Sequence, residues 1–230
     1  ENMPLLIIGA LLAILIYAPS FWVRRVMAKH SKEIAGLPGT GGELALHLIE
    51  LFELIVIKFE ESAANTDHFD PSVPAGRLSP LNLNGKSLTA IAVAAHEVGH
   101  AIQFYRREKV FELRKRYLPL ATRLNQVGVV MMLMIPIAAL VLRTPLAIGG
   151  LIGISLLLQL GGAFAYLIIL PEEWDASFNK ALPVLVEGED VDASQLPAIR
   201  QILKAAALTY FAAALANVLH IGRWFMILRR

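Results

Sequence analysis

Two histidines, His96 and His100, stand four residues apart, and Glu97 directly follows the first of them. On a helix, residues i and i+4 share one face, so both imidazoles could bind a single metal ion. A zinc ion held by three protein ligands keeps one position for a water molecule and lowers the pKa of that water. Glu97 could then take the proton of the water and pass it to a leaving amine. The HExxH pattern therefore predicts zinc-dependent hydrolysis of peptide bonds.

Chance is a weak explanation for this motif. With the His and Glu frequencies of this chain, only ~0.01 matches to HExxH are expected in its whole length. The neighbouring residues are uncharged, as a buried active-site helix requires: Val93, Ala94 and Ala95 before the motif, Ala101 and Ile102 after it. Two partnered core histidines are the structural alternative, but a glutamate in so apolar a helix is costly without a partner or a role.

A third protein ligand must come from elsewhere in the chain. The extended pattern HExxHxxGxxH is absent, because Gln103 and Arg106 stand where it requires Gly and His. Three carboxylates follow a long apolar segment, at Glu172, Glu173 and Asp175. Spacing alone does not choose among them, and acids at the start of a helix can also serve only to satisfy the helix dipole.

The remaining histidines carry weaker signals. His68 lies between Asp67 and Asp70 in a turn-rich segment, where it could donate to the oxyanion that forms on an attacked peptide carbonyl. A hydrogen bond that stabilises the turn is the alternative. A strand near Arg77 could offer an edge to an extended substrate. Three histidines without an acidic or histidine partner at ligand spacing are expected to be structural or surface residues: His30, His47 and His220.

The composition predicts an integral membrane protein. Apolar residues make up 56% of the chain and charged residues 17%, the mean hydropathy is +0.58, and residues 124–171 contain one charged side chain, Arg143. Such a composition excludes disorder and argues against a wholly soluble globule. Membrane spans are expected at residues 3–23, 127–142 and 146–170, and residues 205–221 could form a fourth span or a membrane-associated helix.

Charge and cysteine content exclude other classes. A net charge of +2 gives no basic footprint for nucleic acid. The absence of cysteine excludes disulfides, a thiolate nucleophile and thiolate metal ligands. Spans nearly free of charge argue against a transporter. A non-catalytic membrane scaffold or adaptor with a retained structural metal remains the alternative function, although it would need a closed shell of four ligands.

The orientation in the membrane follows from the first span. Residues 3–23 could be a signal peptide, but the apolar stretch is long and a basic cluster follows it rather than preceding it. The positive-inside rule then predicts that the N-terminus lies outside and that residues 29–126 are cytoplasmic. Residues 171–204 are expected on the same side. The last helix is ambiguous, because the arginines after it would lie outside if it crossed.

The segment 29–126 must position the motif. A helix is predicted from about 87 to 105 with Ser87 as its N-cap, and Thr40 with Glu43 forms a capping box for an earlier helix. Strand character at residues 55–60 and near Arg77 predicts a small antiparallel sheet.

Prolines are expected to interrupt two later segments. Residues 106–123 are basic, carry Pro119, and are expected to lie against anionic headgroups. Pro171 is expected to end the helix of the third span, so that the acids after it begin a new one. The fold class expected is mainly α and integral to the membrane: three or four transmembrane helices, and a cytoplasmic zincin-like helical domain with the small sheet beside the motif helix.

Several segments together resemble one family. The HEVGHAIQ core, TDHFDP at 66–71, RLSP at 77–80, LPEEWDAS at 170–177 and LKAAALTY at 203–210 look like the YugP-type membrane zinc metallopeptidases of bacteria. The resemblance covers almost the whole chain, and the combination of motifs in this order is specific. The family is similar to the HtpX-like and CAAX-processing membrane proteases. In those relatives a glutamate followed by an aromatic residue and, two positions on, an alanine supplies the third ligand.

The resemblance implies a ligand set and an activity. The relatives' pattern falls on Glu173, Trp174 and Ala176, so Glu173 is implied as the third zinc ligand. Asp175 is implied as a residue that orients a histidine, and Ser177 stands where the relatives have an aspartate. The implied protein is a zinc-dependent, multi-pass endopeptidase of the cytoplasmic membrane with its site on the cytoplasmic side. Its expected partners are the lipid bilayer and unfolded or membrane-associated polypeptides.

Overall fold

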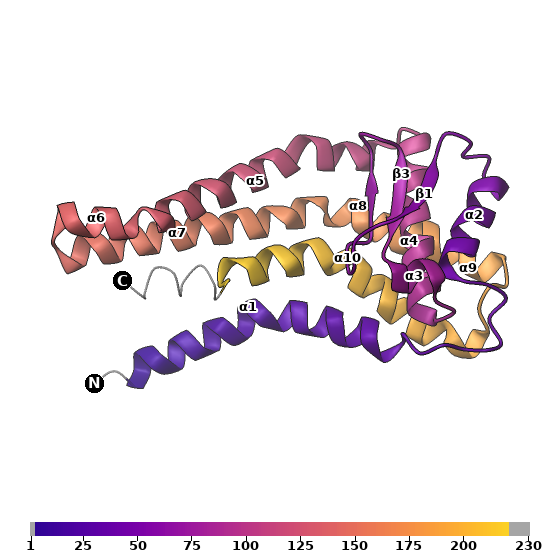
Figure 1. The fold of residues 1–230 in the computed structure, drawn as a ribbon, viewed down its shortest axis with the longest axis horizontal. Helices are drawn as coiled ribbons and strands as arrows, with labels where there is room; N and C mark the ends of the chain where they lie inside the picture. Colours follow the sequence, from indigo (N-terminus) through magenta and orange to yellow (C-terminus); the bar gives the residue numbers. More distant parts are fainter. Residues whose placement is uncertain (1–2, 221–230) are drawn as a thin grey trace. The chain divides into compact units, whose positions relative to one another are not determined.

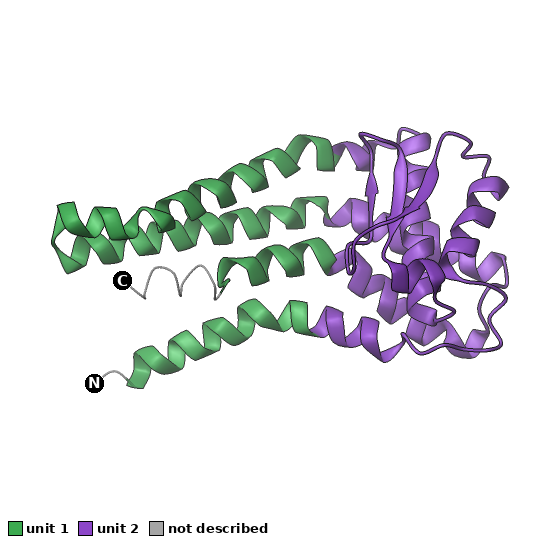
Figure 2. Cartoon of the chain, in the orientation of Figure 1, with its two compact units in different colours: residues 1–21, 113–169, 209–230 green, residues 22–112, 170–208 purple. Residues whose placement is uncertain are grey.

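The described part of the chain is mainly helical, as the sequence predicts, and carries one small sheet (Figure 1). The computed structural model describes residues 3–220. The chain forms two compact units, which are coloured separately in Figure 2. Unit 1 comprises residues 1–21, 113–169 and 209–230, and unit 2 comprises residues 22–112 and 170–208.

Unit 1 consists mainly of parts of long apolar helices. Within residues 3–220, three helices are long and apolar enough to cross a membrane: α1 (Met3–Lys29), the helical run that begins with α7 (Pro145–Ala165), and the run that contains α10 (Leu196–Val218). The segments α5 (Glu112–Leu133) and α6 (Ile135–Leu142) pass the same test together and meet at a bend of 51°, so they could be a fourth span. Pro136 lies at the start of α6 and lacks the N–H that would continue the hydrogen-bond ladder across the bend.

The segments predicted as spans fall on these helices. Residues 3–23 lie in α1, 127–142 on the bent pair α5–α6, and 146–170 in α7 and the helical turns after it. Residues 205–218 lie in α10, whereas residue 221 lies outside the described residues.

Two prolines expected to interrupt helices lie inside helical segments. α5 continues through Pro119, because a single proline removes one of the many hydrogen bonds of a 22-residue helix. After α7, the helical run continues through a 3₁₀ turn into further helix, so it does not end at Pro171 as expected. Pro171 occupies the first turn of that new segment, where a missing N–H is tolerated. The successive segments are η2 (Tyr166–Ile169), α8 (Leu170–Trp174), the π-helix η3 (Asp175–Ala181) and α9 (Leu182–Glu187).

The motif helix α4 (Leu88–Tyr105) forms the centre of unit 2 and confirms the helix predicted there. Every residue from Leu88 to Gln103 is buried, including the polar side chains of the motif. Ser87 is its N-cap and accepts a hydrogen bond from the Ala90 N–H at 3.1 Å. The predicted capping box also forms, between Thr40 and Glu43 at the start of α2 (Gly41–Leu51).

The sheet is mixed rather than antiparallel. It consists of β1 (Lys58–Glu61), β2 (His68–Asp70) and β3 (Ala75–Leu78) in the order β1-β3-β2. β2 pairs antiparallel with β3 across the short turn between them, while β1 pairs parallel with β3. Strand propensity marks which residues extend but does not say which strands pair, so the sequence could not reveal the parallel pair.

The strand that carries Arg77 is therefore the central one. Arg77 pairs with Glu60 of β1 on one side and with His68 of β2 on the other. The prediction of a free substrate-binding edge at Arg77 is wrong, since the hydrogen-bonding groups on both sides of β3 face neighbouring strands. The edges of this sheet are β1 and β2.

Two aspartates hold the sheet together and attach it to α3 (Pro80–Asn84). Asp67 accepts hydrogen bonds from the backbone and hydroxyl of Ser79 and from the Asn82 amide, at 2.8–3.0 Å. Asp70 accepts from the Ser72 hydroxyl and N–H and from Arg77 Nη1, which lies 2.8 Å away. The hydrogen bonds from Ser72, together with that from Arg77, lower the pKa of Asp70 to about 2.

The Asp70→Asn variant is expected to unfold at a lower temperature than the parent at pH 6, with a loss of about 1 kcal/mol, a typical value for partly exposed charge-assisted hydrogen bonds. Because the folded-state pKa is depressed, the contribution of Asp70 is fully present above its ordinary pKa. It is lost as the pH falls from about 4 through about 2. Thermal unfolding at pH 6 and pH 3 measures the difference. A gap between parent and variant that widens on acidification would contradict the assignment.

Candidate metal centre

Three buried side chains of unit 2 bring one potential ligand atom each to a common point. The Nε2 atoms of His96 and His100 lie 3.1 Å apart, and each lies 3.2 Å from Glu173 Oε2. None of the three residues is more than 2% exposed. Their arrangement is one that could hold a metal ion. The histidines come from adjacent turns of α4, but Glu173 comes from α8, so the tertiary contact between these helices creates the cluster.

A close approach of backbones makes that contact. A Cβ atom placed on Gly99 would lie 2.5 Å from the carbonyl oxygen of Ala176, far inside van der Waals contact. Ala176 is itself fully buried, in the π-helix η3. Glu173 and Ser177 lie three residues before and one residue after Ala176, and both contact His96. The glycine inside the motif thus allows α4 and η3 to come near enough for these side chains to meet.

The outer nitrogens of both imidazoles have hydrogen-bond partners. His96 Nδ1 lies 2.8 Å from Ser177 Oγ, and that hydroxyl donates its proton to the Leu203 carbonyl at 2.7 Å. Ser177 Oγ must therefore accept, and His96 Nδ1 carries the proton. His100 Nδ1 lies 2.9 Å from the side-chain oxygen of Gln103, which also accepts. In both neutral rings the lone pair is consequently on Nε2, the atom that faces the cluster.

The donor set fits a zinc ion. A tetrahedral zinc with bonds of about 2.0–2.2 Å holds its ligand atoms about 3.3 Å apart. The three donor atoms lie 3.1–3.2 Å apart. Two imidazole lone pairs and a carboxylate oxygen at such distances repel one another unless a cation lies among them. Neutral imidazole nitrogens with one carboxylate oxygen are also ligands that zinc takes in catalytic sites.

The three acids after the apolar run occupy different positions. Glu173 points an oxygen at both Nε2 atoms, whereas Glu172, fully buried, has its Oε1 3.5 Å from the outer nitrogen of His100. In the described structure Asp175 contacts neither histidine. Its Oδ2 accepts from Gln103 Nε2 at 2.8 Å, so it reaches His100 only through the amide of Gln103.

Two residues with direct contacts to the histidines were not selected from the sequence. In the sequence, Gln103 is noted only because it does not match a longer motif. Its spacing of three residues from His100 on a helix nevertheless predicts that the two side chains meet. Ser177 is noted only because it stands where the relatives have an aspartate. No local signal connects it with His96, because the two are 81 residues apart in the chain.

His68 lies in the edge strand β2 and has the turn hydrogen bond that was its alternative role. Its Nδ1 lies 2.7 Å from the carbonyl oxygen of Thr66 and therefore donates to it. With Nδ1 protonated, a neutral ring offers only an acceptor at Nε2, so His68 could donate to an oxyanion only as an imidazolium. The part of the chain that the structure describes records no contact between His68 and the cluster.

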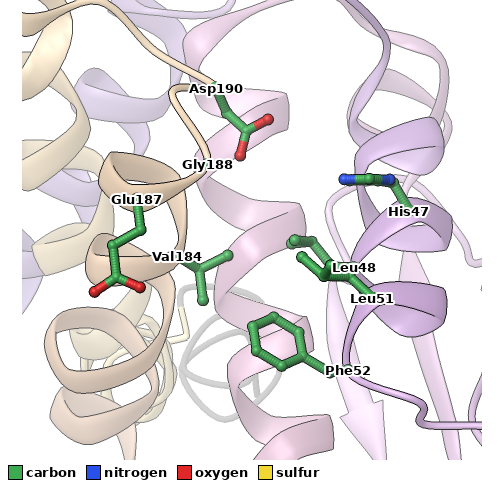
Figure 3. A pocket seen from close by; sticks show the side chains of 8 residues that line it. All are labelled: His47, Leu48, Leu51, Phe52, Val184, Glu187, Gly188 and Asp190. Carbon is green, nitrogen blue, oxygen red and sulfur yellow. The ribbon is translucent and has the colours of Figure 1, made fainter.

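The other histidines do not belong to the cluster in the described residues. His30 Nε2 lies 3.2 Å from the side-chain oxygen of Gln201, and His220 is exposed. His47 lines a separate pocket of about 150 Å³ between α2 and the segment that contains α9 (Figure 3). Apolar side chains and two acids, Glu187 and Asp190, share this lining, and no residue of the metal cluster belongs to it.

Comparison with known proteins agrees with this chemistry. The model of a family described as "Putative neutral zinc metallopeptidase" matches residues 5–229. The chain is also similar to "Putative membrane protease YugP" of Bacillus subtilis (strain 168), with 33% identity over 215 residues. The aligned region covers 90% of this chain and 91% of that relative. No solved structure matches the chain.

The Gly99→Ala variant should be less stable by about 1–3 kcal/mol, as expected when a methyl group is forced into a well-packed contact. It should also bind divalent metal more weakly, since α4 and η3 would be pushed apart. The matched control is Gly153→Ala in α7, because a Cβ at Gly153 has no atom within 4 Å. Thermal unfolding and metal titration of both variants measure the effects. A Gly99→Ala protein as stable and as metal-competent as the control would refute the role of this contact.

Proposed function

Because the chain belongs to the family described as putative neutral zinc metallopeptidases, we propose that it is a zinc-dependent endopeptidase of the cell membrane. The observation that carries the proposal is the meeting of His96, His100 and Glu173 at ligand distances in a buried site. A structural metal in a non-catalytic scaffold would need a fourth side-chain ligand. The cluster in the described residues offers three.

His96, His100 and Glu173 would hold the zinc ion. When bound, zinc supplies Lewis-acid activation of a water molecule and of the scissile carbonyl. Ser177 and Gln103 hold the imidazole protons on Nδ1, so that each Nε2 lone pair stays directed at the cluster. Burial of all three ligands keeps competing solvent away and strengthens electrostatic interactions there.

Glu97 is proposed as the general base. It follows His96 on α4 and is 5% exposed, so its carboxylate lies in the same buried region of the helix. In this role it takes a proton from the attacking water and delivers it to the departing amine, which leaves the carboxylate ready for another cycle. His68 remains a prediction as a donor to the oxyanion, and it would have to be protonated to act.

We also propose a location and a substrate class. Three candidate spans and the bent pair α5–α6 support a multi-pass membrane protein. The basic cluster after the apolar part of α1 supports a cytoplasmic position for unit 2, in agreement with the positive-inside rule. Unfolded or membrane-associated polypeptides are the proposed substrates, because an enzyme anchored in the bilayer meets such chains first.

The Glu97→Gln variant should keep its zinc and lose peptidase activity by about 100-fold or more, since a positioned general base contributes about that much. Zinc content and cleavage of a fluorescently labelled unfolded protein can be measured with the full chain in detergent. Glu33→Gln, which replaces an exposed glutamate, is the matched control. A chelator should stop cleavage by the parent, and added zinc should restore it. If Glu97→Gln and the parent bind zinc and cleave at equal rates, the peptidase proposal fails.

The orientation can be tested with single cysteines, because the chain contains none. Ala64 is exposed in unit 2, and Thr144 is exposed in the turn between α6 and α7. In intact bacterial cells, a membrane-impermeant maleimide should label the Thr144→Cys variant and spare Ala64→Cys until the membrane is permeabilised. The reverse pattern would place unit 2 outside the cytoplasm.

A further inference from the structure

We propose that Gln103 is a positioning residue: it determines which nitrogen of His100 carries the proton and thereby strengthens metal binding at the cluster. The inference rests on the proposed function in one respect, that the cluster is a zinc site. Gln103 is fully buried on α4, three residues after His100. Its side-chain oxygen lies 2.9 Å from His100 Nδ1.

The amide of Gln103 has only one satisfactory orientation. Its Nε2 lies 2.9 Å from the Glu172 carbonyl oxygen and 2.8 Å from Asp175 Oδ2. A backbone carbonyl and a carboxylate only accept hydrogen bonds, so the NH₂ group must face them. A flipped amide would set its own oxygen against two other acceptor oxygens, none of which can donate a hydrogen bond. The oxygen of Gln103 therefore faces His100, and His100 must present an N–H to it.

A partly buried ion pair keeps Asp175 an acceptor. Lys180 Nζ donates to Asp175 Oδ2 at 2.8 Å, and Asn179 donates to Oδ1 at 2.9 Å. Lys180 Nζ also donates to Glu108 Oε2, 2.9 Å away, in the loop after α4. An aspartate that accepts a hydrogen bond from a lysine on one oxygen and from an amide on the other stays a carboxylate. It therefore has no proton to donate to Gln103. The negative charge of Asp175 thus acts on His100 indirectly: it orients the Gln103 amide, and the amide oxygen accepts the His100 proton.

The two imidazoles are held by different means. His96 donates to a neutral hydroxyl, Ser177 Oγ, which in turn donates to the Leu203 carbonyl. His100 donates to an amide whose other end is hydrogen bonded to an ion-paired carboxylate. Partners of this kind raise ligand basicity and fix ring orientation, and their loss typically weakens metal binding about 10–100-fold.

The test replaces Gln103 with Met, which has a similar length and no hydrogen-bonding amide. The Gln103→Met variant of the full chain in detergent should bind zinc about 10–100-fold more weakly in competition with a chelating indicator. Gln159→Met is the matched control, because Gln159 is also fully buried but lies in unit 1. Its zinc affinity should equal that of the parent.

A spectroscopic measurement separates positioning from a general loss of structure. In the metal-free parent, ¹⁵N spectra of labelled histidine should show the His100 ring protonated at Nδ1, with the signals assigned by comparison with His100→Ala. In Gln103→Met both neutral tautomers should be populated. Zinc affinity equal to the parent's, or a ring still protonated only at Nδ1, would overturn the proposal.

A second pair of variants decides the question if Gln103→Met does not fold. Asp175→Asn keeps an acceptor oxygen for Gln103 and should retain most of the zinc affinity. Asp175→Ala leaves the Glu172 carbonyl as the remaining acceptor for the amide and should lose affinity by a smaller factor than Gln103→Met. Equal affinities in the two Asp175 variants would overturn the proposal. Failure of the parent to bind zinc would instead refute the proposed function, so the two failures are distinguishable.

Discussion

The contact between Gly99 and the Ala176 carbonyl is the constraint on which the rest of the site depends. It allows α4 and the π-helical segment after α8 to approach closely enough for Glu173 and Ser177 to contact His96. A side chain at Gly99 would separate the two helices, and ligand distances tolerate very little separation. The two histidines share one helix face through their spacing alone. Glu173 lies near them only because this contact brings α4 and η3 together.

Burial of so many polar groups is destabilising unless each group has a partner. The histidine outer nitrogens satisfy this requirement through Ser177 and Gln103, and the same bonds leave the inner nitrogens as acceptors. The three inward atoms repel one another and are stabilised together only by a cation. A metal ion held there would couple metal binding to the stability of unit 2, because a metal that binds only the assembled cluster contributes its binding free energy to folding.

Unit 1 uses glycine for close helix packing in the same way. A Cβ at Gly128 would lie 2.7 Å from Gln159 Cγ, and a Cβ at Gly162 would lie 2.9 Å from the Ala121 carbonyl oxygen. The Ser155 hydroxyl donates to the Gly128 carbonyl at 2.6 Å. Small residues and buried hydroxyls are the usual means by which helices associate in lipid, where apolar side chains gain little from leaving the solvent. The two units thus share one packing device.

Local features of this protein could be read from its sequence alone. The motif helix, its N-cap at Ser87, the capping box at Thr40 and the apolar helices all depend on residues within a few turns of one another. Three features depend on residues far apart in the chain: the meeting of Glu173 with the two histidines, the central place of β3 in a mixed sheet, and the route from Asp175 to His100 through Gln103. Only the tertiary structure decided these, because spacing specifies which face of its own helix a side chain occupies and not which distant backbone comes to meet it.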